Sequence, residues 1–112
     1  MDEGRLNQVF GALAHATRRG LLSRLRAGEA SVSELAEPYG MSLPAISRHL
    51  KVLETAGLIG RTVDGRFHRC HLRPEAVVQA ADWIDQHRHF WSGRFDARAN
   101  YIDLMKAESG DE

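Results

Sequence analysis

A row of small and cationic side chains on one predicted helix is the feature best suited to binding another molecule. At 100° per residue, Ile46, Leu50 and Leu53 fall on one face of a helix that follows Ser42. The opposite face carries Ser42, Pro44, Ala45, Ser47, Arg48 and Lys51. Small groups at the helix start allow close approach to DNA base edges, and the two cations can reach guanines or phosphates. The pattern predicts a DNA-reading helix, against the alternative of a solvated basic face.

A basic hairpin is predicted directly after this helix, over about residues 58–72. Arg61, Arg66 and Arg69 lie in it, where they can follow the DNA backbone or enter the minor groove. The dipeptide Asp64-Gly65 predicts a two-residue turn.

That turn sets the expected pairing of the two strands. It pairs Val63 with Arg66 and, counted back, Ile59 with Cys70. Cys70 is expected to be a small buried hydrophobic residue.

A second, shorter helix is needed to position the DNA-reading helix. Ser31 and Glu34 form a possible capping box, and Pro38 predicts that this helix is short or distorted near its end. Ser42 then caps the next helix and Gly57 ends it. Residues of about 31–57 therefore predict a helix-turn-helix, and the basic hairpin makes it a winged one.

Two further amphipathic helices precede this motif. The first has its apolar stripe at Leu6, Val9, Phe10 and Leu13, and the second, capped by Thr17, has Leu21, Leu22 and Leu25 inward before Gly28 ends it.

A long helix over about residues 74–107 follows the wing. Its stripe runs through Val77, Ala80, Ala81 and Ile84, and a second aromatic line is rotated by about 100° from it. So wide an apolar arc predicts a dimer interface made by Phe10, Trp83, Phe90, Trp91, Phe95 and Ile102. The alternatives are burial within the same chain and, as an addition, binding of an apolar small molecule.

Length, charge and cysteine content narrow the class of protein. The 112 residues carry 15 bases and 15 acids, which suits one domain over residues 1–112. Residues 42–73 hold six bases against two acids, a net of +4, and residues 74–112 hold four against eight, a net of −4. One cysteine, no signal-like start and no membrane-length apolar run predict a cytoplasmic protein. The expected fold is α+β and mostly helical, with four helices, a wing and a long C-terminal helix, and it is dimeric.

The chain resembles the ArsR/SmtB family of bacterial winged-helix repressors over nearly its whole length. The most specific part is Ser47-x-His49-Leu50-Lys51-x-Leu53-x-x-x-Gly57-Leu58. The segment Ala16-Thr17-Arg18-Arg19 resembles the family's second-helix start, although His15-Ala16 replaces the usual aspartate-proline.

The resemblance implies a homodimer on a palindromic operator, released by a ligand that is often a metal. It places Ser42, Pro44, Ala45, Ser47, Arg48 and Lys51 at the major groove and Arg66 at the wing tip. We add Arg18 and Arg19 to the predicted DNA contacts. His49, on the flank of the apolar face, is expected to be packed or bonded to a phosphate.

The chain departs from the family where metal ligands are expected. The predicted third helix, residues 32–39, has no cysteine, and Asp85-x-His87 lacks its partner because Arg98 stands at the required histidine position. His68 and Cys70 share a hairpin face, but two ligands do not close a zinc site. We therefore expect no metal or other cofactor.

No catalytic motif is present, so we expect no enzyme activity. The expected partners are double-stranded DNA, a second copy of the chain and an unidentified inducer, with no membrane. Two other functions stay open, a metal-responsive repressor and a winged-helix module that binds proteins.

Overall fold

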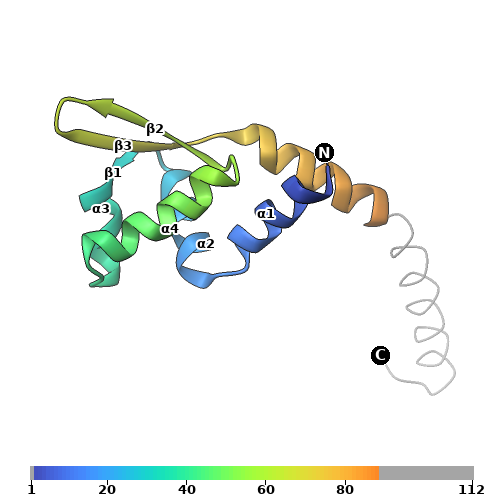
Figure 1. Ribbon diagram of the computed structural model, residues 1–112, viewed down its shortest axis with the longest axis horizontal. Coiled ribbons are helices and arrows are strands. Elements are labelled where there is room, and N and C mark those ends of the chain that lie inside the picture. Colours follow the sequence, from blue (N-terminus) through green and yellow to red (C-terminus); the bar gives the residue numbers. More distant parts are fainter. Residues whose placement is uncertain (1, 89–112) are drawn as a thin grey trace, which may run out of the picture. The chain divides into compact units, whose positions relative to one another are not determined.

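The computed structural model describes residues 2–88, and Figure 1 labels most of its helices and strands. They are α1 (Glu3–Leu13), α2 (Ala16–Leu25), β1 (Ala30–Ser31), α3 (Val32–Ala36), η1 (Glu37–Tyr39), α4 (Leu43–Thr55), β2 (Ile59–Asp64) and β3 (Phe67–Leu72). A further helix covers residues 74–88. The chain divides into two compact units, Met1–Ala80 and Ala81–Glu112, and the first contains every labelled element. This is the predicted winged helix-turn-helix, mostly helical with a small antiparallel sheet.

Local capping starts the two helices of the helix-turn-helix as predicted. The Ser31 hydroxyl accepts a bond of 3.1 Å from the Glu34 N–H, and the Glu34 carboxylate accepts one of 3.2 Å from the Ser31 N–H. Ser42 caps α4 by accepting a bond of 3.3 Å from the Ala45 N–H. Pro38 lies in η1, a 3₁₀ turn that directly follows α3. The α-helix α3 is therefore short, as expected.

The cap of α2 differs from the prediction. His15, rather than Thr17, is the N-cap, and its Nδ1 accepts a bond of 3.2 Å from the Thr17 N–H. His15 has the extended backbone that an N-cap needs, whereas Thr17 already lies in the first helical turn. An imidazole nitrogen here replaces the oxygen that usually caps a helix.

The hairpin register also differs from the prediction by two residues. Asp64 pairs with Phe67 and Ile59 with Leu72, so Gly65 and Arg66 form the turn in place of Asp64 and Gly65. Gly65 has φ +62 and no described non-glycine residue has positive φ, which is the pattern of a turn with glycine first. The predicted turn required positive φ at Asp64. A shift of two keeps every side chain on its expected face.

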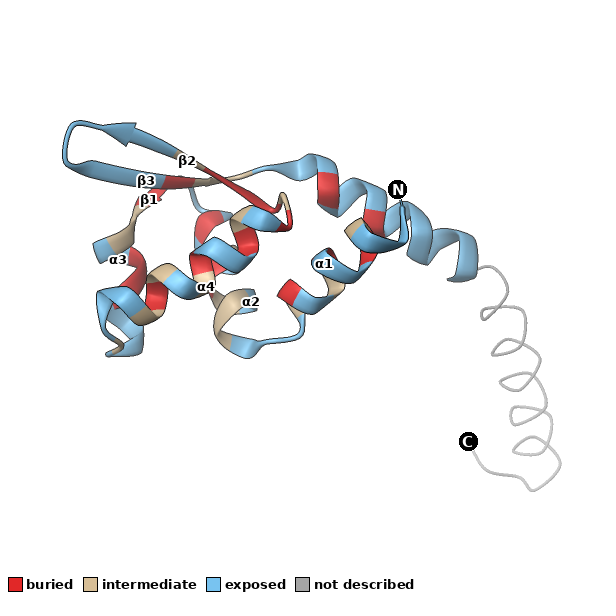
Figure 2. Ribbon diagram, viewed as in Figure 1, coloured by how far each residue is buried: buried red, intermediate tan, exposed pale blue. Residues whose placement is uncertain are grey.

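The core lies where α1, α2, α3 and α4 meet the inner side of the sheet, as Figure 2 shows by its red segments. The predicted inner face of α4 is fully buried at Ile46, Leu50 and Leu53. Cys70 is buried as predicted and pairs with Ala30 in β1. Burial raises the pKa of the Cys70 thiol, which makes it a packing group rather than a reactive one.

The helix over residues 74–88 buries only part of the predicted apolar stripe. Within the first unit Ala76 and Ala80 are buried, whereas Val77 is 47% exposed. Ala80 and Val77 both belong to the predicted stripe, and of the two only Ala80 is covered within its own chain. Val77 and Val78 therefore remain exposed apolar groups.

Alanine substitutions at Gly57 and Gly11 are expected to change the free energy of unfolding in opposite directions. Gly57 ends α4 with φ +76, while the Leu58 N–H bonds to the Leu53 carbonyl at 3.0 Å, as in a Schellman motif. Alanine there should lower the free energy of unfolding by about 1–2 kcal/mol, the strain of a left-handed conformation. Gly11 lies inside α1 with nothing within 4 Å of an added Cβ. Gly11→Ala should raise that free energy by about 0.5–1 kcal/mol.

Urea unfolding monitored by circular dichroism measures both glycine effects. Equal signs for Gly57→Ala and Gly11→Ala would contradict the assignment of the left-handed cap.

Candidate nucleic-acid interface

The outer face of α4 presents the predicted DNA-reading side chains together. Ser42, Pro44, Arg48 and Lys51 are exposed, and Ala45 and Ser47 are half-buried beside them. The Lys51 side chain is 73% exposed, and its ammonium lies 3.7 Å from Glu54. An exposed pair of this kind is weak, so Lys51 can exchange it for another anion.

Glu54 joins the wing to α4. Its second carboxylate oxygen accepts a bond of 3.1 Å from Nε of Arg61, and the Arg61 side chain is only 23% exposed. Arg61, predicted from the sequence to follow the DNA backbone, therefore holds the root of the wing. The sequence prediction missed Glu54, although its place one turn before the basic hairpin is a signal for such a pair.

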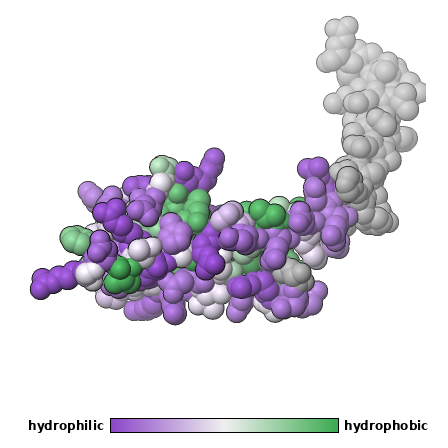
Figure 3. All heavy atoms as spheres, turned by 90° about the horizontal axis from the view of Figure 1, so that it is seen from above, coloured by the Kyte–Doolittle hydropathy of each residue, from purple (hydrophilic) through white to green (hydrophobic). Residues whose placement is uncertain are grey.

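The structure forms a groove of about 440 Å³ between the wing, the start of α3 and the start of α4. It is lined by Ser31, Val32, Ser33, Leu43, Ser47, Arg61, Arg66, Phe67 and His68. The lining includes no carboxylate, and because Arg61 is paired with Glu54, Arg66 is the cation that makes the groove suit an anionic strand. The sequence prediction also missed Phe67, an aromatic side chain 66% exposed beside the turn. Seen from above, hydrophobic residues form patches in a mostly hydrophilic surface (Figure 3).

Two of the predicted DNA contacts, Arg18 and Arg19, donate hydrogen bonds within the fold. Arg18 donates from Nε to the Ala12 carbonyl at 2.7 Å and from Nη2 to the Gly11 carbonyl at 3.1 Å. Arg19 donates to the Leu13 carbonyl at 2.8 Å. Cations are favoured at the last carbonyls of a helix, and both arginines come from the start of α2. They therefore fasten α2 to the end of α1.

Arg18 also reaches His49 on α4. Its Nη1 lies 3.3 Å from Nδ1 of His49, and the ring centroids of His49 and His15 are 4.6 Å apart. A guanidinium can only donate, so Nδ1 of His49 accepts and carries no proton. Burial first, and then His15 and Arg18, lower the pKa of His49. His49 is thus a packed residue, as one of the two sequence alternatives had it.

Within residues 2–88 no three histidine, cysteine, aspartate or glutamate side chains come together as metal ligands do. None of the helices in this part of the chain has the length and apolar content of a membrane span.

Known proteins share this arrangement. A helix-turn-helix domain family matches residues 13–60. The transcriptional regulator Rv2034 of Mycobacterium tuberculosis is 35% identical over 105 residues, covering 94% of this chain and 92% of its own. The crystal structure of an ArsR family transcriptional regulator, RHA00566, is 37% identical with a TM-score of 0.77, covering 82% of this chain and 95% of its own. The protein belongs to the ArsR/SmtB family of transcriptional regulators.

A solution structure of a possible ArsR-family transcriptional regulator gives information on that protein's assembly. The winged helix-turn-helix DNA-binding domain of Mb0332 from Mycobacterium bovis is homodimeric. It is 27% identical to this chain with a TM-score of 0.62, covering 78% of this chain and 82% of its own. This chain therefore shares its fold with a winged helix-turn-helix DNA-binding domain that is homodimeric in solution.

Proposed function

We propose that this ArsR-family regulator binds a palindromic operator as a homodimer and represses transcription by occluding it. The observation that carries this proposal is the outer face of α4, where Arg48 and Lys51 are exposed next to a groove lined by arginines and no acid. An exposed basic helix after a tight turn is the geometry that reads a major groove.

Each part of this surface has a proposed role. The small residues at the start of α4, Ser42, Pro44, Ala45 and Ser47, allow the helix to approach the bases. Arg48 reads a guanine edge, and Lys51 reads a base or a phosphate. Arg66 at the wing tip contacts the DNA backbone or the minor groove, while Arg18 and Arg19 act indirectly by holding α1 and α2.

The proposed dimer uses the helix predicted over residues 74–107. Val77 and Val78 are exposed apolar side chains at its start, and Phe10 is half-buried on α1. Trp83, also proposed for this interface, is 38% exposed. The other proposed anchors, Phe90, Trp91, Phe95 and Ile102, lie outside the described residues. The homodimeric Mb0332 domain supports this assembly.

In this proposal residues 1–112 form one DNA-binding domain, which consists of the helix-turn-helix, the wing and the dimerisation helix. It needs neither a catalytic group nor a cofactor, and it places the protein in the cytoplasm with its operator. An inducer of unidentified chemistry is compatible with it.

The decisive experiment is selection of bound duplexes from a random DNA pool by the full chain. We expect an enriched palindrome whose half-site centres lie about 34–36 Å apart, or a whole-turn multiple of that. A pool that shows no enriched sequence, with no retention on DNA-cellulose at low salt, would refute the proposal and favour a protein-binding module.

Release from the operator should not depend on zinc. The chain lacks the cysteine pair and the histidine spacing that the family resemblance implies for a metal sensor, and burial raises the pKa of the Cys70 thiol, which disfavours the thiolate that zinc needs. Operator affinity should change less than about twofold with stoichiometric zinc, a shift below ~0.4 kcal/mol. Submicromolar zinc binding by calorimetry that is lost in His87→Ala or Cys70→Ser would contradict this prediction.

A further inference from the structure

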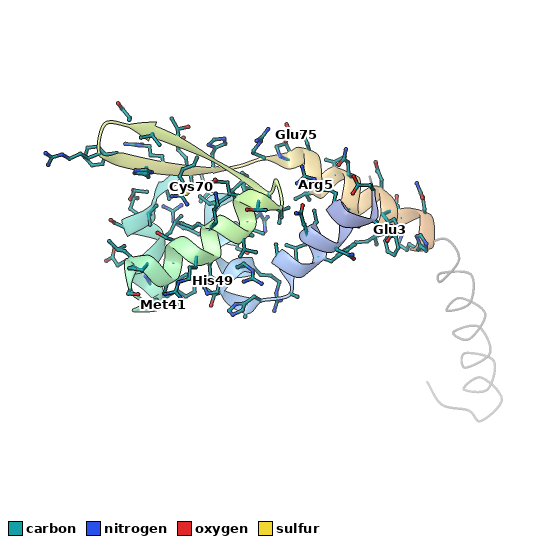
Figure 4. The ribbon with its side chains drawn as sticks, in the orientation of Figure 1. Glu3, Arg5, Met41, His49, Cys70 and Glu75 are labelled. Atoms are coloured by element: carbon teal, nitrogen blue, oxygen red, sulfur yellow. The ribbon has the colours of Figure 1, made fainter. Side chains whose placement is uncertain are left out.

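His15, Arg18 and His49 form a cluster at the junction of α1, α2 and α4. Figure 4 labels His49 on α4, where its ring meets the start of α2. Arg18 joins this ring at 3.3 Å to the carbonyls of Gly11 and Ala12 at the end of α1. One arginine thereby connects the DNA-reading helix with both N-terminal helices.

Both imidazoles in this cluster serve as acceptors through Nδ1. His15 accepts the Thr17 N–H at 3.2 Å and so caps α2, and His49 accepts from Arg18. Neither donor can accept a bond, because a backbone N–H and a guanidinium only donate. A proton on Nδ1 of His49 therefore breaks its bond to Arg18.

The charges around His49 oppose its protonation. The groups that act electrostatically on His49 are His15 and Arg18, and both are basic. At this junction α1 supplies the carbonyls of Gly11 and Ala12, α2 supplies Arg18 with His15 as its cap, and α4 supplies His49. A protonated His49 would place two positive charges 3.3 Å apart with no acid among its partners.

We propose that this cluster is a pH-sensitive switch, in which protonation of His49 breaks its bond to Arg18, loosens the contact of α4 with α2 and weakens operator binding. The inference rests on the proposed function, because its output is affinity for DNA. The proposed signal is mild acidification, which changes the contact between α2 and α4 and not the DNA-reading face itself. Imidazole is the side chain whose charge ordinarily changes between pH 5 and 8.

The free energy of unfolding, like operator affinity, should fall as the pH is lowered. The pKa of His49 is lowered in the fold by burial, with His15 and Arg18 adding to it, so the unfolded chain takes up its proton first as pH falls. The contribution of neutral His49 to the free energy of unfolding has its full value above about pH 6.5, the ordinary pKa of imidazole. It is lost as pH falls through the lowered folded value.

The direction of the DNA response separates this switch from plain electrostatics. Added positive charge by itself strengthens DNA binding as pH falls. The switch predicts the opposite, a fall in affinity of about tenfold between pH 7.5 and 5.5, the size expected when one charge-assisted hydrogen bond is lost.

The experiment measures the affinity of the full chain for its selected duplex at fixed salt across this pH range. The test variant combines His15→Asn with His49→Gln, because both amides can accept the same bonds without titrating. Its affinity at pH 7.5 should match wild type and change less than about twofold on acidification, under ~0.4 kcal/mol. His71→Gln on β3, outside the cluster, is the matched control and should follow wild type.

Several results would overturn the switch. Wild-type affinity that is constant or rises on acidification refutes it, as does an equal fall in the double variant. A fall that coincides with loss of the helical circular dichroism signal is global unfolding and also refutes it. As a second readout, the ¹⁵N chemical shift of Nδ1 in His49 should be that of an unprotonated acceptor at pH 7.5. If no duplex is selected at any pH, the proposed function itself fails, whereas a selected duplex with a flat pH profile refutes the switch alone.

Discussion

Replacing Arg48 with alanine is expected to remove base preference at one position of each half-site and to weaken operator binding. Arg48 is exposed on the outer face of α4, one turn after its small N-terminal residues. An arginine that binds a guanine edge with two hydrogen bonds contributes about 1–3 kcal/mol of discrimination, or roughly 5-fold to 150-fold in relative affinity. Fluorescence anisotropy with the selected duplex and with single-base variants measures this loss.

Arg66→Ala is the matched comparison for Arg48→Ala. Arg66 lies in the wing turn and lines the groove beside α4. If it contacts the backbone, its removal should weaken all duplexes alike and reduce the salt dependence of binding by about one charge. Equal losses on operator and random DNA in Arg48→Ala would show that Arg48 contacts a phosphate, and its assignment as a base-reading residue would be wrong.

The double substitution Trp91→Ala with Phe95→Ala is expected to convert the protein into a folded monomer that has lost tight operator binding. The predicted helix of residues 74–107 would be about 50 Å long, more than a domain of this size is wide. Part of it must then reach beyond its own core, and large aromatics usually dominate such interfaces. Joining two DNA-reading helices raises the effective concentration of the second, so affinity should fall by about 100-fold or more.

Analytical ultracentrifugation, beside operator affinity at one salt concentration, tests this dimer prediction. Asp96→Ala is the control, because Asp96 is an acid expected on the exposed face of the same helix and its loss should leave the dimer intact. A monomer that binds the operator as tightly as wild type would refute the dimer requirement. A double variant that simply unfolds would show that the aromatics fill the core of their own chain.

Short-range patterns were sufficient to predict most of the helix-turn-helix. The capping box of Ser31 with Glu34 and the cap at Ser42 depend on residues three apart, and both are confirmed. The inward set of Ile46, Leu50 and Leu53 follows from helical periodicity and is fully buried. Because these features involve one helix turn at a time, the amino-acid order alone determines them.

Pairings between strands could be predicted only in part. The dipeptide Asp64-Gly65 correctly indicated a hairpin, but the turn uses Gly65 first and Arg66 second. Alternation along a strand specifies which face a side chain takes, and a register shift of two leaves that alternation unchanged. The choice between the two registers depends on turn conformation and on the contact of the strands with β1 and the core.

The roles of the basic and titratable residues were decided by tertiary structure. The sequence identifies Arg18, Arg19 and Arg61 as cations, but their partners are the end of α1 and Glu54. His15 and His49, 34 positions apart, meet only because α2 packs against α4. Within residues 2–88, the sequence by itself determined which helices form and which face of α4 is apolar. The packing of those helices decided which cations remain exposed to bind DNA, because a guanidinium bonds whichever acceptor the fold brings within reach.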